Sequence, residues 1–254
     1  MSVTPILLAL LAAQAAPAVP TAQSCAALAR SAPEKAVDAA SAWRLQGGGL
    51  PARHCLGLAY TAMERWAPAA EAFGQAAAEA EIAKDPRRSD WWVQSGNAWL
   101  AAGDAAKARS AFDSALVAGI SSPELRGEVH LDRARAAVAL GALGAARSDI
   151  ELALKLVPGD PFVWVLSSAL ALKEEQVGRA QADIAKATEL APEDPDVLLQ
   201  AGNVAGVSGD VEQARTLFAK AARAAPDSPA GKAAAAALAA NAGEPASASK
   251  PQSR

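Results

Sequence analysis

Hydrophobic and small residues recur along most of this chain with the period of an α-helix. Between Ser89 and Ser122 they form two groups, which are Trp92, Gly96 and Trp99, and then Ala108, Phe112 and Ala115. This spacing places each group on one face of a helix. Gly103 and Asp104 lie between the groups and are typical of a turn. The stretch therefore predicts two antiparallel helices joined by a short connection.

The same arrangement recurs in units of 34 residues, with small residues at positions 8, 20 and 27 and a large apolar residue at position 24. Small residues let two helices cross closely, while the large residue fills the space beside the crossing. The last three units also share a proline at position 32. We predict five units, at residues 50–83, 89–122, 127–160, 161–194 and 195–228.

This pattern resembles the tetratricopeptide repeat (TPR). The resemblance implies an all-α fold, a right-handed α-solenoid of about five stacked helix-turn-helix repeats with capping helices at its two ends. It also implies that the first helix of each repeat lines a concave groove that binds protein or peptide. An irregular alanine-rich helical bundle is the alternative reading of the same composition.

The segments beside the repeats are predicted to close the stack. Residues 23–49 are interpreted as an N-terminal capping helical hairpin, with Ser24 as the N-cap of its first helix and Pro33 at the start of its second. Residues 229–241 are predicted to form a C-terminal capping helix. Residues 242–254 are rich in Ser, Pro, Ala and Lys, which predicts a disordered tail.

The connections between repeats follow a common pattern in the second half of the chain. Asp160, Asp194 and Ser228 each precede a proline, and each is predicted to be an N-cap residue. A short insertion at Pro123–Arg126 is expected before the unit that begins at Gly127.

The first 22 residues are interpreted as a secretory signal peptide. An apolar core at Ile6–Ala13 is followed by small residues and prolines, although no Lys or Arg precedes it. The core is shorter than the roughly 20 residues of a membrane-spanning helix, so no stable span is expected after cleavage. We therefore expect a periplasmic or secreted protein. The alternative is a cytosolic repeat protein with an uncleaved leader.

Cys25 and Cys55 are the only cysteines in the chain. Their spacing does not fit a CxxC motif, and no histidine cluster accompanies them, so a zinc site is not expected. In an exported protein the natural interpretation is a disulfide that ties the N-terminal hairpin to the first repeat. Two buried, reduced thiols are the alternative.

The sequence contains no motif for catalysis. His54 and His130 each lack a second ligand at helical spacing, and no nucleotide or nucleophile fingerprint occurs. A net charge of −3 offers no basic surface for nucleic acid. We predict a protein that is not an enzyme, without metal or cofactor, that binds protein or peptide and not nucleic acid.

The TPR resemblance further implies which residues face the groove. Carried onto this chain, the predicted partner-binding residues are Asp90, Val93, Asn97, Leu131, Arg135, Val165, Lys173, Leu199 and Asn203. Glu128, Phe162, Ala169 and Asp196 occupy groove positions as well. The cationic clamp that some family members use for a carboxylate is not supported, because position 5, one of its Lys or Arg positions, is occupied by His54, Val93, Leu131, Val165 and Leu199. We expect a mildly apolar groove with scattered amides, in an exported adaptor or, alternatively, in a structural subunit of a larger envelope assembly.

Overall fold

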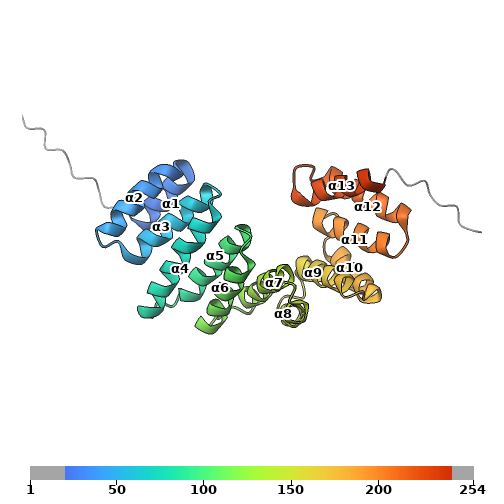
Figure 1. Cartoon of the computed structure of the whole chain (residues 1–254), viewed down its shortest axis with the longest axis horizontal. Helices are drawn as coiled ribbons and strands as arrows, with labels where there is room; N and C mark the ends of the chain where they lie inside the picture. Colours follow the sequence, from blue (N-terminus) through green and yellow to red (C-terminus); the bar gives the residue numbers. More distant parts are fainter. Residues whose placement is uncertain (1–20, 242–254) are drawn as a thin grey trace, which may run out of the picture.

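The computed structural model describes residues 21–241, and this part of the chain forms thirteen α-helices without a strand. The helices are α1 (Ala22–Ser31), α2 (Pro33–Leu45), α3 (Gly49–Ala62), α4 (Trp66–Ile82), α5 (Arg88–Ala101), α6 (Ala105–Ala118), α7 (Pro123–Ala139), α8 (Leu143–Leu156), α9 (Pro161–Lys173), α10 (Val177–Leu190), α11 (Pro195–Val207), α12 (Val211–Ala224) and α13 (Pro229–Asn241). They stack into an arch with α5, α7, α9 and α11 toward its inner side (Figure 1). The predicted all-α solenoid is confirmed.

Each predicted repeat consists of two neighbouring helices, from α3–α4 to α11–α12. In three repeats the two helices can cross closely because a glycine lies at their contact. A Cβ atom placed on Gly96 would lie 2.5 Å from Cε1 of Phe112, which is fully buried. Gly202 has the same relationship to Phe218, and Gly57 to Phe73. Glycine therefore occupies position 8 wherever phenylalanine occupies position 24.

The two remaining repeats solve the same packing problem with different residues. Ala134 and Ile150 are fully buried in one cluster, and Ser168 and Ile184 occupy the corresponding positions of the next repeat. A smaller side chain at position 24 thus accompanies a larger one at position 8. The summed volume at the crossing stays similar, as close packing requires.

The helix caps agree with the sequence at most joints. Asp160 accepts a hydrogen bond from the amide of Phe162, Asp194 from that of Asp196, and Ser228 from that of Gly231. The expected insertion at Pro123–Arg126 is helical and does not lengthen the connection, because these residues form an additional first turn of α7. Its N-cap is Ser122.

The N-terminal helix begins differently from the prediction. Thr21, and not Ser24, is the N-cap of α1, and the two residues form a reciprocal capping box in which each side chain accepts from the other's amide. The predicted leader lies outside the described residues except for Thr21 and Ala22, which belong to this cap and helix. The predicted tail at 242–254 also lies outside them.

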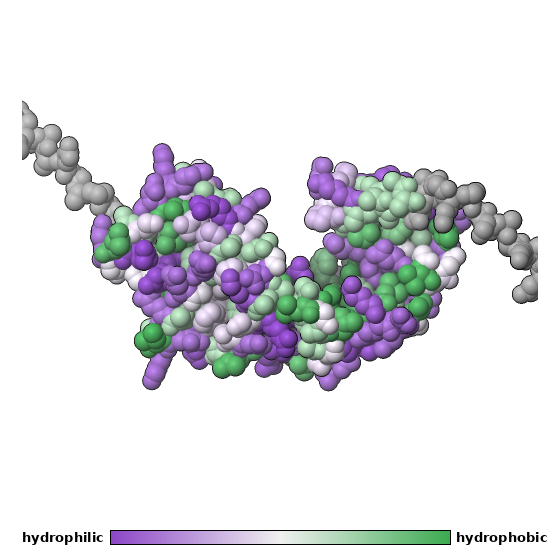
Figure 2. All heavy atoms as spheres, viewed as in Figure 1, coloured by the Kyte–Doolittle hydropathy of each residue, from purple (hydrophilic) through white to green (hydrophobic). Residues whose placement is uncertain are grey.

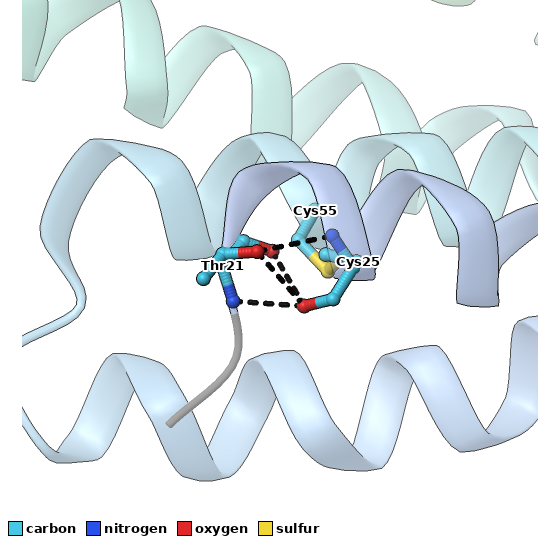
Figure 3. The surroundings of a disulfide bond; sticks show 4 residues. Thr21, Cys25 and Cys55 are labelled. Carbon is cyan, nitrogen blue, oxygen red and sulfur yellow. Dashed lines mark hydrogen bonds between the residues drawn. A yellow bond between two sulfur atoms is a disulfide. The ribbon is translucent and has the colours of Figure 1, made fainter. Parts of the chain in front are cut away.

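A disulfide joins Cys25 on α1 to Cys55 on α3, with 5.8 Å between their Cα atoms. Figure 3 shows it beside the Thr21 cap. The two cysteines are buried together with Ala40 and Leu56. The predicted pairing is thus present, and it fixes the capping hairpin to the first repeat.

Over residues 21–241, no helix has the length and apolar character needed to cross a membrane.

Candidate functional site

Three hollows follow one another along the inner side of the arch. The first, of about 490 Å³, lies between α5 and α7, and the second, of about 560 Å³, lies between α7, α9 and the start of α11. The third, of about 660 Å³, lies between α9 and α11–α13. Asp132 and Arg135 line the first two, and Ala169 lines the last two. The hollows therefore form one continuous surface, here called the inner groove.

Most of the predicted partner-binding residues line this inner groove. They are Asn97, Leu131, Arg135, Val165, Lys173 and Asn203. The structure does not bring Asp90, Val93 and Leu199 into the hollows. Val93 and Leu199 are half-buried against apolar clusters, whereas Asp90 is exposed in the first turn of α5.

The second hollow has an apolar floor. Leu131, Phe162, Val165 and Leu166 contribute to it, and Phe162 keeps 45% of its surface exposed. Figure 2 shows hydrophobic residues at the bottom of the arch beside strongly hydrophilic ones. An exposed phenylalanine in a concave surface is suited to contact an apolar side chain of a partner.

Carboxylates surround this apolar floor. Glu128, Asp132, Asp160 and Asp196 line the second hollow, and Arg135 is its one cationic side chain. Arg135 donates a hydrogen bond to Asp132 over 3.0 Å. The groove is thus more acidic here than the expected pattern of apolar residues and amides.

Two of these carboxyl groups have pKa values above the ordinary value of an aspartate side chain. Burial raises the pKa of Asp132 above its ordinary value, and Arg135 opposes this effect. Burial and then the neighbouring carboxylate of Asp194 raise the pKa of Asp196. A cation placed beside these groups would favour their ionised forms.

The third hollow has the opposite character. Lys173 and Arg215 line it together with amides and apolar side chains, and no carboxylate takes part. Asn203 donates from its amide to Gln200 over 3.3 Å, and the buried Gln200 donates to Ser168 over 3.2 Å. The position of the Asn203 side chain is therefore fixed by a hydrogen-bond chain that reaches into the core.

Each histidine packs against side chains of neighbouring helices. His54 packs edge-on against Trp91 with 4.3 Å between ring centroids, and burial lowers its pKa. His130 is buried, with Nδ1 2.9 Å from Asp149, whose other oxygen accepts from Arg133. Across the described residues, no group of three His, Cys, Asp or Glu side chains could hold a metal ion.

The sequence matches no protein-family model and no curated protein. Solved structures do match. PilW, a type IV pilus biogenesis factor, has a TM-score of 0.63 at 17% identity over 83% of this chain and 96% of its own. PilF from Pseudomonas aeruginosa has a TM-score of 0.61 at 18% identity over 85% and 97%. YrrB, a TPR protein with an unusual peptide-binding site, has a TM-score of 0.51 at 19% identity over 73% and 90%.

The chain has the tetratricopeptide-repeat fold. Its repeats correspond to α3–α4, α5–α6, α7–α8, α9–α10 and α11–α12. The first helices α5, α7, α9 and α11 supply most of the inner groove, and α12 and α13 complete its third hollow. The crossing residues identified from the sequence hold the two helices of each repeat together, and three of them, Gly202, Ala214 and Phe218, also line the third hollow.

Proposed function

We propose that this protein is a non-catalytic interaction scaffold that binds a peptide or protein segment in its inner groove. The observation that carries the proposal is the continuity of the three hollows over α5, α7, α9 and α11. A continuous groove of this kind suits an extended or helical segment, because such a segment contacts several repeats at once. YrrB, which has the same fold, has an unusual peptide-binding site.

We further propose that the protein works outside the cytoplasm, in the periplasm or after secretion. The disulfide between Cys25 and Cys55 supports this location, because such bonds persist in oxidising compartments. The apolar segment at Ile6–Ala13 is consistent with export. Sequencing of the mature N-terminus tests the location, and a chain that retains Met1 in the cell contradicts it.

The binding function is tested by crosslinking in cells followed by mass spectrometry of the attached proteins. The test variant carries Asn97→Ala, Arg135→Ala and Asn203→Ala in the groove. The control carries Gln181→Ala, Gln213→Ala and Arg223→Ala, which remove the same chemical groups from the second helices α10 and α12. Gln181 and Gln213 also line a hollow of about 790 Å³ outside the groove.

If the groove is the binding site, the test variant should lose its crosslinked partners and the control should keep them. If only the control loses them, the binding site is the hollow between α10 and α12. If both variants keep them, neither hollow is the binding site. A partner that stays bound in fixed stoichiometry through purification would instead favour the structural-subunit alternative. Thermal unfolding of each variant shows whether its fold is intact.

A further inference from the structure

We infer that the second hollow binds a segment in which lysine or arginine side chains flank an apolar side chain. This inference rests on the proposed groove function and adds the chemistry of the partner. It is carried by a combination of shape, exposed apolar surface and unbalanced charge within one hollow of about 560 Å³.

The apolar part of the argument begins with Phe162. It lies in the first turn of α9 and remains 45% exposed, beside the half-buried Leu131, Val165 and Leu166. When a partner's side chain covers an aromatic ring with apolar neighbours in a concave surface, water is excluded and binding is favoured. The hollow is large enough to accept one such side chain.

The charge around this floor selects the partner. Four carboxylates face the hollow and one guanidinium does, and that guanidinium pairs with Asp132. Within residues 21–241, neither the side chain of Glu128 nor that of Asp196 has an ion pair or hydrogen-bond partner. An acidic segment would meet repulsion here, whereas a basic one would find two uncommitted carboxylates and a third that caps α9 at Asp160.

The position of these carboxylates sets the order of side chains that the segment needs. Glu128 belongs to α7 and Asp196 to α11, so they lie on opposite sides of α9 and its apolar floor. A segment with an apolar residue between two basic ones therefore matches the hollow better than a basic or an apolar segment alone. Beyond Ala169 the groove continues to Lys173, which suits a carboxylate further along the same segment.

The test uses three fluorescein-labelled peptides of equal length and fluorescence anisotropy on the full chain. The first peptide has leucines flanked by lysines, the second has glutamate in place of each lysine, and the third has serine in place of each leucine. We expect the first to bind at least about tenfold more tightly than either of the others, and to weaken as salt is added. Equal binding of the first and second peptides overturns the inference.

Two variants locate the binding. Glu128→Gln with Asp196→Asn should weaken the lysine–leucine peptide about tenfold, while the control Glu71→Gln with Glu175→Gln, which removes two exposed carboxylates elsewhere, should leave it unchanged. If Asp196→Asn disturbs α11, Glu128→Lys alone remains informative, because Glu128 is exposed and its reversal should improve binding of the glutamate peptide. Equal effects of test and control variants contradict the site.

The outcome is separable from that of the proposed function. If the crosslinked partners depend on the groove but the peptides show no preference for lysine, the scaffold stands and its partner has other chemistry. Self-association that the Glu128→Gln/Asp196→Asn variant abolishes, measured by sedimentation, would assign the hollow to a second copy of this chain and overturn the inference.

Discussion

Gly96 and Phe112 lie so close together that a methyl group on residue 96 would overlap the phenyl ring of residue 112. They stand 16 residues apart, one on each helix of the same repeat, and the same separation links Ala134 with Ile150. Because the two side chains share one space, the size of one limits the size of the other. This relationship can be measured as a coupling free energy.

The first prediction is a double-mutant cycle at this crossing. Gly96→Ala should lower the free energy of unfolding by about 1–3 kcal/mol, because the ring of Phe112 must move. Combined with Phe112→Ile, the same change should cost much less, since the pair then matches Ala134 and Ile150. Urea titration measures the four proteins, and we expect a coupling of about 1 kcal/mol or more.

The control for this cycle is Gly144→Ala in α8, where a built Cβ atom meets nothing within 4 Å. Here the change should stabilise the protein by about 0.5–1 kcal/mol, because alanine is the better helix former. A destabilisation as large as that at Gly96 would show that the contact with Phe112 is not the cause.

The second prediction compares two phenylalanines. Phe218→Ala should lower the unfolding free energy by roughly 3–5 kcal/mol, because Phe218 is 5% exposed and its removal leaves a cavity between α11 and α12. Phe162→Ala should change it by less than about 1 kcal/mol, because 45% of the surface of Phe162 is already exposed to solvent. Chemical denaturation followed by circular dichroism measures each variant. Equal losses would be inconsistent with the burial of Phe218.

The third prediction concerns the disulfide. Replacement of Cys25 and Cys55 by alanine should cost about 3 kcal/mol, because an opened loop of roughly 30 residues gains entropy when the chain unfolds. Since repeats contact mainly their neighbours, the loss should be local. Hydrogen exchange should quicken in α1–α3 and stay unchanged in α11–α13. Uniform acceleration across the chain would contradict this expectation.

The fourth prediction follows from His54. Burial lowers its pKa, Gln94 opposes this through a hydrogen bond, and Arg87 adds repulsion. The unfolded chain therefore binds a proton more readily than the folded one, so stability contributed by this site falls as the pH drops below about 6.5. His54→Gln should remove that part of the pH dependence between about pH 7.5 and 5.5.

Thermal unfolding at the two pH values measures this effect for the wild type and the variant. The two proteins differ only at residue 54, so the comparison isolates the effect of this side chain. An identical shift of the melting temperature in the two proteins would show that His54 does not titrate in this range upon unfolding.

The repeat fold was predictable because its signal is local and repeated. A helix crossing is indicated by small residues at positions 8, 20 and 27 and a large one at position 24. The contact is made by two residues of one unit, such as Gly202 and Phe218. The helical state of Pro123–Arg126 has a local signal as well. Ser122 and Pro123 form the same cap-and-proline start as Asp160 and Pro161, and α7 is one turn longer than α9.

The acidic hollow was less accessible to sequence reasoning. Glu128 and Asp196 occupy known groove positions, but Asp132 reaches the hollow from the side of α7 and Asp160 from the N-cap of α9. Their meeting depends on how neighbouring repeats stack, which no single unit determines. Val93 and Leu199 show the opposite case, because the family positions implied groove residues while the stacking half-buries them.

The crossing pairs also restrict how a chain of this kind can be shuffled. A genetic crossover between two repeats that falls between positions 8 and 24 separates the members of a pair. Joining the glycine of one unit to the isoleucine of another leaves a void, and joining alanine to phenylalanine produces a clash. Exchange that preserves folding is therefore confined to the joints between repeats, such as the segment from Pro192 to Pro195, where whole units can be gained or lost intact.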